Sequence, residues 1–296
     1  MSGHEHGHQS GDHGGHQHGH SHQHDHDFDW ETWAGQLELE ADTLMPLIDE
    51  VVAQHTPDVD WSTIQHVLDL GCGPGVISCA LAHHAPRAHV TALDSSVQLL
   101  TRVRAHAITQ QVATRVHTVE ADMEAVLPAL RPMDVVWAGM VLHHVANAAL
   151  VLAKLHTLLH PGGTLVMIEF ADAPVALPPG DPAADAWNRL QVGVTASRNA
   201  RLGLDPLAID WPALLDAARF DHVTDQTITT LRPAPLDDVP RTWLQQHILR
   251  GVEWLEDELS DDDVAVLTTL ADTIATRDDV FVQSERRVIT ARRPVR

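Results

Sequence analysis

The feature that most constrains the fold is a regular alternation of short apolar strands and helices between residues 67 and 170. Apolar runs of strand length lie at 67–70, 89–93, 116–119, 134–138 and 164–169. Segments with helical character lie between them, at 75–84, 95–109, 123–129 and 146–159. Because successive strand–helix–strand units form right-handed crossovers, the alternation predicts an α/β fold with a largely parallel sheet.

Further helices and strands flank this alternation. Residues 30–55 have apolar positions at helical spacing, and Pro57 ends the run. Helices are also predicted at 184–205, 211–219, 240–258 and 261–276, with Asp210 and Ser260 as N-caps of two of them. Strands are predicted at 222–230, 280–282 and 287–290. No linker after residue 60 forces a separate domain, so we expect helices over 30–60, a core over 61–170 and helical insertions at 171–209 and 233–276.

Composition excludes several classes of protein. The net charge is −22, with 19 Lys and Arg against 41 Asp and Glu, which argues against nucleic-acid binding because phosphates need basic partners. The chain has no apolar run long enough to span a membrane and no secretory signal pattern. Its two cysteines, Cys72 and Cys79, cannot form a disulfide scaffold. We therefore expect a cytoplasmic protein without a membrane partner.

Histidine is concentrated at the N-terminus, where residues 1–29 hold 10 of the 23 copies. This segment has no apolar periodicity, and we predict that it is a disordered tail. It carries five acids and no Lys or Arg, so −17 of the charge belongs to residues 30–296. Imidazoles suit zinc, nickel or copper, and a tail of this composition also binds such ions adventitiously. The candidate metal ligands are His16, His18, His20, His22, His24 and His26.

The first strand ends in the glycine-rich turn Asp69-Leu70-Gly71-Cys72-Gly73-Pro74-Gly75. Glycines at this place allow a ligand to approach the backbone closely. Asp94 follows 23 residues after Gly71, at the end of the second strand, where an acid can bind ribose hydroxyls. This half of the sheet is therefore predicted to bind a nucleoside. A pyrophosphate-binding turn would need its third glycine at Val76, so a dinucleotide-dependent oxidoreductase is disfavoured.

The turn resembles motif I of the class I S-adenosylmethionine-dependent methyltransferases, and the resemblance continues in order through residue 170. Asp94 matches the family's ribose-binding acid, and Asp122–Met123 matches its adenine-binding position. Residues 138–144 match the motif of the fourth strand, and 159–165 match the turn before the fifth. The resemblance implies a doubly wound, mostly parallel seven-stranded sheet of Rossmann-like type. It also implies that S-adenosylmethionine is bound by Asp69, Gly71, Cys72, Gly73, Gly75, Asp94, Ser95, Asp122, Met123, Gly139 and Met140.

Several of these residues have an alternative structural role. Asp94 and Asp122 can each serve as the N-cap of a following helix, alone or in addition to binding a ligand. Cys72 is expected to be a small residue of the turn rather than a nucleophile, and Cys79 a buried helix residue.

A methyltransferase has to align the acceptor with the bond to the methyl group and shield both from water. A general base is needed only when the acceptor atom is protonated at neutral pH. The candidate catalytic residues are His143 and His144, after the fourth strand, and Glu169, at the end of the fifth. The alternative is that the histidines cap or pack the next helix and that Glu169 binds backbone amides.

The acceptor is expected to be chosen by the additions to the core, which are the helices at 30–55 and the insertions at 171–209 and 233–276, with the two insertions acting as a lid. Tryptophans in these additions either line an apolar pocket or pack in the lid's own core: Trp30, Trp33, Trp187, Trp211, Trp243 and Trp254. Because the charge disfavours nucleic acids, a small organic molecule is the expected acceptor. A monomer and a homodimer are both compatible with the sequence. The competing hypothesis is a metal-storage protein that uses the histidine tail, with the fold as a carrier domain.

Overall fold

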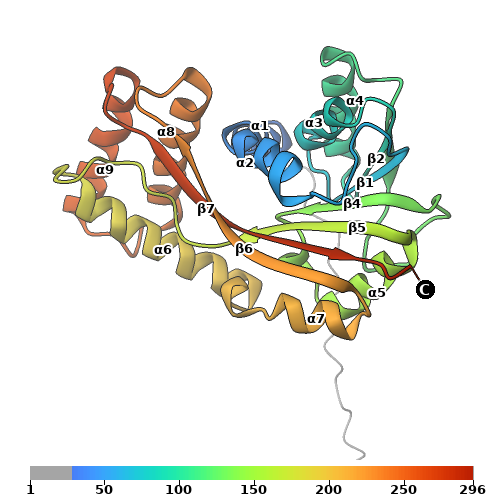
Figure 1. Ribbon diagram of the computed structural model, residues 1–296. Coiled ribbons are helices and arrows are strands. Elements are labelled where there is room, and N and C mark those ends of the chain that lie inside the picture. Colours follow the sequence, from blue (N-terminus) through green and yellow to red (C-terminus); the bar gives the residue numbers. More distant parts are fainter. Residues whose placement is uncertain (1–28, 296) are drawn as a thin grey trace, which may run out of the picture.

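A computed structural model describes residues 29–295, so the predicted tail lies outside the described residues except for Asp29. Seven strands form one sheet in the order β3-β2-β1-β4-β5-β7-β6 (Figure 1). They are β1 (His66–Leu70), β2 (His89–Asp94), β3 (Val116–Glu120), β4 (Met133–Gly139), β5 (Leu159–Phe170), β6 (Asp221–Arg232) and β7 (Val282–Arg292). All pairs are parallel except those of β7, which runs antiparallel to both neighbours. The predicted mostly parallel, seven-stranded α/β fold is confirmed.

The helices follow the predicted segments closely. They are α1 (Trp30–Thr43), α2 (Met45–Glu50), α3 (Val76–His84), α4 (Val97–Thr109), α5 (Ala148–Leu158), α6 (Ala184–Leu202), α7 (Trp211–Ala217), α8 (Asp238–Trp254) and α9 (Asp261–Thr273). Both predicted N-caps are confirmed, because Asp210 accepts from the Ala213 N–H and Ser260 from the Asp263 N–H. No helix within 29–295 has the length and apolar character needed to cross a membrane.

Alternate side chains of the strands build a core on each face of the sheet. Val67 of β1 packs in a cluster with residues of α2, α3 and α4. Its neighbour Leu68 points to the opposite face and packs with α5 and α7. This two-residue period explains why the strands are continuous apolar runs, since both faces of a doubly wound sheet are covered.

A third apolar cluster joins α6, α8 and α9 beside the long ends of β6 and β7 (Figure 1). Two glycines set the close approach of these helices. A Cβ on Gly251 of α8 would lie 2.7 Å from Leu190 of α6, and one on Gly193 would lie 2.6 Å from Leu255. We call α6, α8 and α9 the helical module; it contains most of the two predicted insertions.

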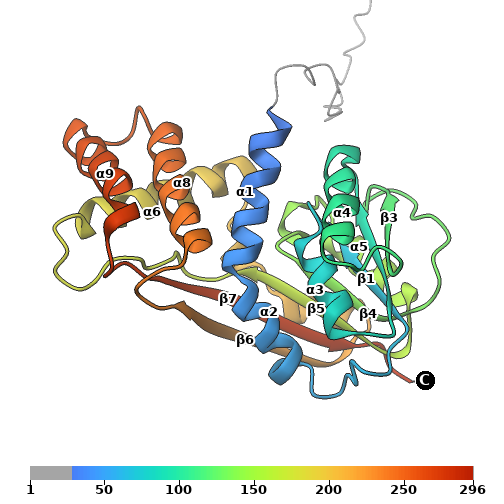
Figure 2. The same ribbon diagram turned by 90° about the horizontal axis from the view of Figure 1, so that it is seen from above.

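Helix α1 lies between the helical module and the doubly wound core, as Figure 2 shows. One side of α1 packs on α8, where Arg250 Nη1 donates to Gln36 Oε1 at 2.8 Å. The other side approaches α3 and α4. The position of α1 therefore depends on both parts of the molecule.

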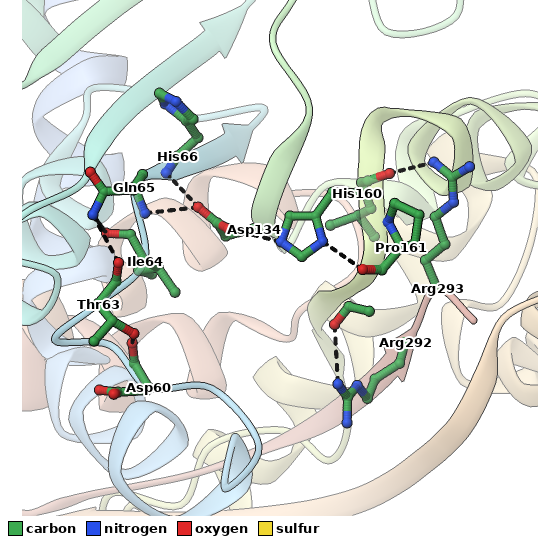
Figure 3. A network of polar contacts seen from close by, with 12 residues as sticks. Asp60, Thr63, Ile64, Gln65, His66, Asp134, His160, Pro161, Arg292 and Arg293 are labelled. Carbon is green, nitrogen blue, oxygen red and sulfur yellow. Dashed lines mark hydrogen bonds and ion pairs between the residues drawn. The ribbon is translucent and has the colours of Figure 1, made fainter. Parts of the chain in front are cut away.

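A polar network holds three parallel strands together at the edge where they begin (Figure 3). Asp134 of β4 accepts from the backbone N–H groups of Gln65 and His66, each at 2.8 Å. Its other oxygen lies 2.8 Å from His160 Nε2 of β5. Because this network fixes β1, β4 and β5 at one end, the opposite, carboxyl ends of these strands are left to carry the site.

The helix predicted at 123–129 is absent, and this prediction was wrong. After β3 the chain makes a turn at 123–125 and then runs without regular structure to β4. Pro128 and Pro132 lack the N–H groups that a helix needs. The ammonium group of Lys154 binds the carbonyl oxygens of Met123, Glu124 and Ala125 instead, at 3.1, 2.6 and 2.6 Å. A side chain from α5 thus replaces the hydrogen bonds of the missing helix.

Candidate active site

A cavity of about 540 Å³ lies at the carboxyl ends of β1, β2, β4 and β5, with α1 forming its far wall. This volume falls within the range of about 300–1,000 Å³ typical of small-molecule sites. The lining includes ten of the residues predicted to bind the cofactor: Asp69, Gly71, Cys72, Gly73, Asp94, Ser95, Asp122, Met123, Gly139 and Met140. It also includes His143 and His144. The structure therefore brings together nearly all the predicted site residues, while their individual roles stay predictions.

The three glycines of the turn differ in what they allow. All have positive φ, at 65°, 54° and 89° for Gly71, Gly73 and Gly75. A Cβ on Gly71 would lie 2.4 Å from Val141, and one on Gly75 would lie 2.8 Å from Val103 of α4. A Cβ on Gly73 would meet nothing within 4 Å. Gly71 and Gly75 therefore permit close protein packing, whereas Gly73 leaves open space that a ligand can enter.

Asp94 closes the turn from the end of β2. Its Oδ2 accepts from the Gly73 N–H at 3.0 Å, and its Oδ1 accepts from the Ser96 N–H at 2.9 Å. Burial raises the pKa of this carboxyl group above its usual value. The N-cap of α4 is Ser96, whose Oγ accepts from the Leu99 N–H, so the alternative that Asp94 caps this helix is wrong.

Asp122 also caps no helix, because none follows it; its Oδ1 accepts from the Glu124 N–H at 2.8 Å and fixes the turn. Cys72 and Cys79 are both buried free thiols, as predicted. Burial raises the pKa of the Cys72 thiol, and it raises that of Cys79 to about 11, so both remain protonated at neutral pH. Neither cysteine has the thiolate character of a nucleophile.

Asp69 is a buried carboxyl group at the floor of the cavity, 2% exposed. Ser78 of α3 donates to its Oδ2 at 2.5 Å. Burial, with a smaller contribution from the charge of Asp94, raises the pKa of Asp69 to about 7. A cation that binds here would meet a carboxyl group able to take up a full negative charge, because its proton is weakly held near neutral pH.

His143 and Glu169 form a buried pair beneath the cavity. His143 Nδ1 lies 2.6 Å from Glu169 Oε2, and the two side chains are 2% and 1% exposed. Glu169 Oε1 accepts from the Leu142 N–H at 3.0 Å. Since a carboxylate only accepts, Nδ1 carries the proton and Nε2 is left with its lone pair. Glu169 does not line the cavity itself; it contacts the histidine that does.

His144 lies beside His143, with their ring centroids 4.1 Å apart. Burial, and then the neighbouring His143 ring, lower the pKa of His144 to about 4. His144 is therefore neutral at physiological pH and a much weaker base than an ordinary histidine. Gly75, the remaining predicted site residue, packs against α4 and does not line the cavity.

The apolar wall was predicted in part: Trp30 and Trp33 of the helical segment at 30–55 line the cavity, as one of their two expected roles, whereas the other wall residues were not predicted. Helix α1 contributes Trp30, Trp33, Leu37, Glu40, Ala41 and Leu44, and the strand ends contribute Trp137, Ile168 and Phe170. The α1 residues follow one helical face, which was the available signal. Of the six tryptophans considered from sequence, Trp187, Trp211 and Trp243 pack in cores, and Trp254 is 47% exposed. Within residues 29–295, no lining residue comes from 171–276, so the predicted acceptor lid at 171–209 and 233–276 stays a prediction.

The predicted metal ligands, from His16 to His26, lie outside the described residues. Between residues 29 and 295, no group of three or more His, Cys, Asp or Glu side chains is arranged to hold a metal ion.

Comparison with known proteins gives the same assignment for the core. A protein-family model described as "Methyltransferase domain" matches residues 67–163. Trans-aconitate 2-methyltransferase of Azoarcus sp. is 36% identical over 101 residues, which are 34% of this chain and 37% of that protein. Ubiquinone biosynthesis O-methyltransferase of Xylella fastidiosa is 40% identical over 33% of this chain and 39% of that protein. The matched part spans less than two fifths of these relatives.

Solved structures show the same fold over a longer part of the chain. Phosphoethanolamine N-methyltransferase 2 of Haemonchus contortus, in complex with S-adenosyl-L-methionine, has a TM-score of 0.51 at 14% identity and covers 83% of this chain and 52% of that one. The YcgJ protein of Bacillus subtilis has a TM-score of 0.51 at 14% identity, over 83% of this chain and 99% of that one. Together with the sheet order, the family match, which begins at the first strand and contains the glycine turn, identifies residues 67–163 as a methyltransferase domain of the class I, Rossmann-like type.

Proposed function

We propose that this protein is an S-adenosylmethionine-dependent methyltransferase that acts on a small organic acceptor. The observation that carries the proposal is a single cavity whose lining extends from the glycine turn after β1 to the His143 ring after β4. The predicted nucleoside-binding turn and His143, which pairs with Glu169 beneath the cavity, thus belong to the same space. Methyl transfer needs the donor and the acceptor to meet with water excluded, and an acceptor that is protonated at neutral pH also needs a base.

The residues of the turn fit the cofactor. The open space beside Gly73 gives a ligand access to the backbone, and Asp94 is held at the edge of that space by two backbone N–H groups. We assign ribose binding to Asp94, contacts with the adenine to Asp122 and Met123, and the amino group to Asp69. Bound S-adenosylmethionine would supply a methyl group already activated by its sulfonium charge.

His143 is the candidate general base. Its Nδ1–H is committed to Glu169, so Nε2 is free to accept a proton from an acceptor in the cavity. Glu169 is a positioning residue, because it fixes the tautomer and orientation of the imidazole. Its second oxygen is held by the Leu142 N–H, which keeps the carboxylate in place. Two curated relatives are named O-methyltransferases, which supports an oxygen atom as the methyl acceptor.

Calorimetric titration of the full chain with S-adenosylhomocysteine, the demethylated product of the cofactor, tests the proposal. We expect binding by the wild type and an affinity lower by roughly tenfold or more in Asp94→Ala, which loses a charged hydrogen-bond partner. The matched control is Asp278→Ala, at an exposed position in the loop after α9, which should bind like the wild type. Absence of binding by the wild-type protein would refute the proposal.

The base and its positioning residue can be separated from cofactor binding. We expect His143→Gln to lower the methyl-transfer rate by roughly a hundredfold or more while product affinity is unchanged. In Glu169→Gln an NH2 group replaces one of the two oxygens that contact the Leu142 N–H and the His143 Nδ1–H, so one of these donors loses its acceptor and the pH profile of the rate should change as well. If the methyl-transfer rate of His143→Gln equals that of the wild type, His143 is not the general base.

The metal-storage alternative has no support from the comparisons, since the matching family model and the named curated relatives are methyltransferases. Its candidate ligands, and the predicted zinc, nickel or copper, belong to the undescribed N-terminal residues. The cytoplasmic location stays a prediction. For the insertions at 171–209 and 233–276, we propose an indirect effect on the acceptor, through the packing of α8 against α1.

A further inference from the structure

The cavity has two chemically different halves. The half at the glycine turn is polar and contains Asp69, Asp94 and Asp122. The other half is formed by α1, by the end of β5 and by residues 140–144. On α1 the lining positions follow the spacing of one helical face, and all are apolar except Glu40: Trp30, Trp33, Leu37, Glu40, Ala41 and Leu44. We call this second half the acceptor half.

The acceptor half offers no positive charge to a ligand. Among residues 29–295, no Lys or Arg side chain lines the cavity. Two arginines contact residues of the lining without lining the cavity themselves. Arg198 of α6 stacks on the Phe170 ring, 4.0 Å from its centroid, so Phe170 presents a ring to the cavity in place of that charge. Arg286 of β7 is buried at 7% exposure and pairs with Glu40.

The negative charge of the acceptor half is already compensated. The carboxylate that lines the acceptor half belongs to Glu40, and its Oε1 atom lies 3.6 Å from Arg286 Nη2. His144 is neutral, since its pKa is lowered to about 4. A ligand that carries a carboxylate or phosphate would be desolvated here without a counter-ion. A ligand that carries an ammonium group would compete with Arg286 for Glu40.

From this arrangement we propose that the methyl acceptor is an uncharged, predominantly apolar molecule with one hydroxyl group, held against α1 with the hydroxyl at His143. This inference rests on the proposed methyltransferase function and names its substrate class. Leu37 is the specificity-determining position, because it lies one turn from both Trp33 and Ala41 on the lining face.

The reaction at such a hydroxyl balances with the groups present. The hydroxyl proton passes to His143 Nε2, and the oxygen forms the new bond to the methyl carbon. The electron pair of the broken carbon–sulfur bond stays on sulfur, which loses its positive charge. The imidazolium formed is stabilised by Glu169, 2.6 Å from Nδ1, and later releases its proton to solvent.

Three phenols with the same ring and different charges test, on the full-length protein, whether the cavity prefers an uncharged acceptor. They are methyl para-hydroxybenzoate, which is neutral; para-hydroxybenzoate, an anion; and para-hydroxybenzylamine, a cation. Calorimetry in the presence of saturating S-adenosylhomocysteine measures affinity, and mass spectrometry with S-adenosylmethionine measures methylation. We expect the neutral probe to bind roughly tenfold or more tightly than either charged probe, and to be methylated fastest.

A charge-introducing variant tests the role of α1. Leu37→Arg should raise the affinity for para-hydroxybenzoate by roughly tenfold relative to the wild type, because the anion then has a partner. The control Ile108→Arg adds the same charge on α4, where Ile108 is 69% exposed, and should change nothing. A thermal melt of both variants shows whether they are folded.

The outcomes are distinguishable from a failure of the proposed function. If S-adenosylhomocysteine does not bind, the methyltransferase proposal fails. If it binds and a charged probe binds as tightly as the neutral one, or the neutral probe does not bind, only the inference on the acceptor is overturned. If Leu37→Arg and Ile108→Arg change the affinity for para-hydroxybenzoate equally, α1 does not determine acceptor specificity.

Discussion

Replacing Asp69 by Asn should change the pH dependence of stability in a direction opposite to that of most carboxylates. Asp69 is buried, and its pKa rises from 3.8 to about 7 in the folded protein. Between these two values the folded chain keeps a proton that the unfolded chain has released. Stability therefore falls as pH rises through this window, because the native state binds more protons than the unfolded state.

The magnitude follows from the size of the shift. A rise from 3.8 to about 7 is roughly three pKa units, and each unit corresponds to 1.36 kcal/mol, so ionising Asp69 costs about 4 kcal/mol of folding free energy. Asn has nearly the same shape and can still accept from Ser78 Oγ, the hydrogen bond seen at 2.5 Å. Asp69→Asn should thus be close to neutral at pH 4 and more stable than the wild type by about 4 kcal/mol at pH 8.

Urea denaturation of the full chain at several pH values between 4 and 8 measures this. Other groups also titrate in the range, including His247, whose pKa burial lowers to about 4. The difference between wild type and variant at each pH removes their contribution. We expect this difference to grow steadily with pH up to about 7. A difference that is constant, or that shrinks with pH, would refute the assignment of a raised pKa to Asp69.

Three further predictions concern single contacts. Gly71→Ala should destabilise the protein by about 1–3 kcal/mol more than Gly73→Ala, because only at Gly71 would the new Cβ clash with Val141; thermal or urea unfolding measures both. Lys154→Met should cost about 1–3 kcal/mol, since it leaves up to three carbonyl oxygens without their shared donor, and proteolysis should increase within 121–132. Arg250→Met, which removes the bond to Gln36, should weaken binding of methyl para-hydroxybenzoate while S-adenosylhomocysteine binding, by the same calorimetry, stays unchanged.

The sheet could be predicted from sequence because its strands are buried on both faces. In β1 the residues from Val67 to Leu70 are all buried, and the sequence there is apolar except for Asp69. The glycine pair that was predicted to lie in a turn before the fifth strand lies inside β5, and its presence has a similarly local reason. At Gly163 a Cβ would lie 3.0 Å from the carbonyl oxygens of His160 and Met133, so only glycine fits. Such local constraints leave clear marks in a sequence.

The helix expected at 123–129 shows where local reasoning fails. Its apolar residues satisfy helical spacing, but the conformation is decided by Lys154, 30 residues away in the chain. The same limit applies to Asp94. The spacing after the glycine turn predicted where Asp94 lies. That Ser96, and not Asp94, caps α4 depends on the direction in which the helix leaves the turn. Contacts of this kind become visible only in three dimensions.

The acceptor half was hardest to foresee because it is not part of the sheet. The glycine turn and the ends of β2 and β4 are fixed by the strand register, and a sequence motif can therefore mark them. Helix α1 reaches the cavity only because one of its sides packs on α8 and the other approaches α3 and α4. Its lining face has no motif, since an apolar face at helical spacing is equally typical of an ordinary core helix. We therefore expect cofactor recognition and acceptor recognition to rest on separate parts of this molecule, so that changes in the helical module should alter acceptor binding without altering the cofactor site.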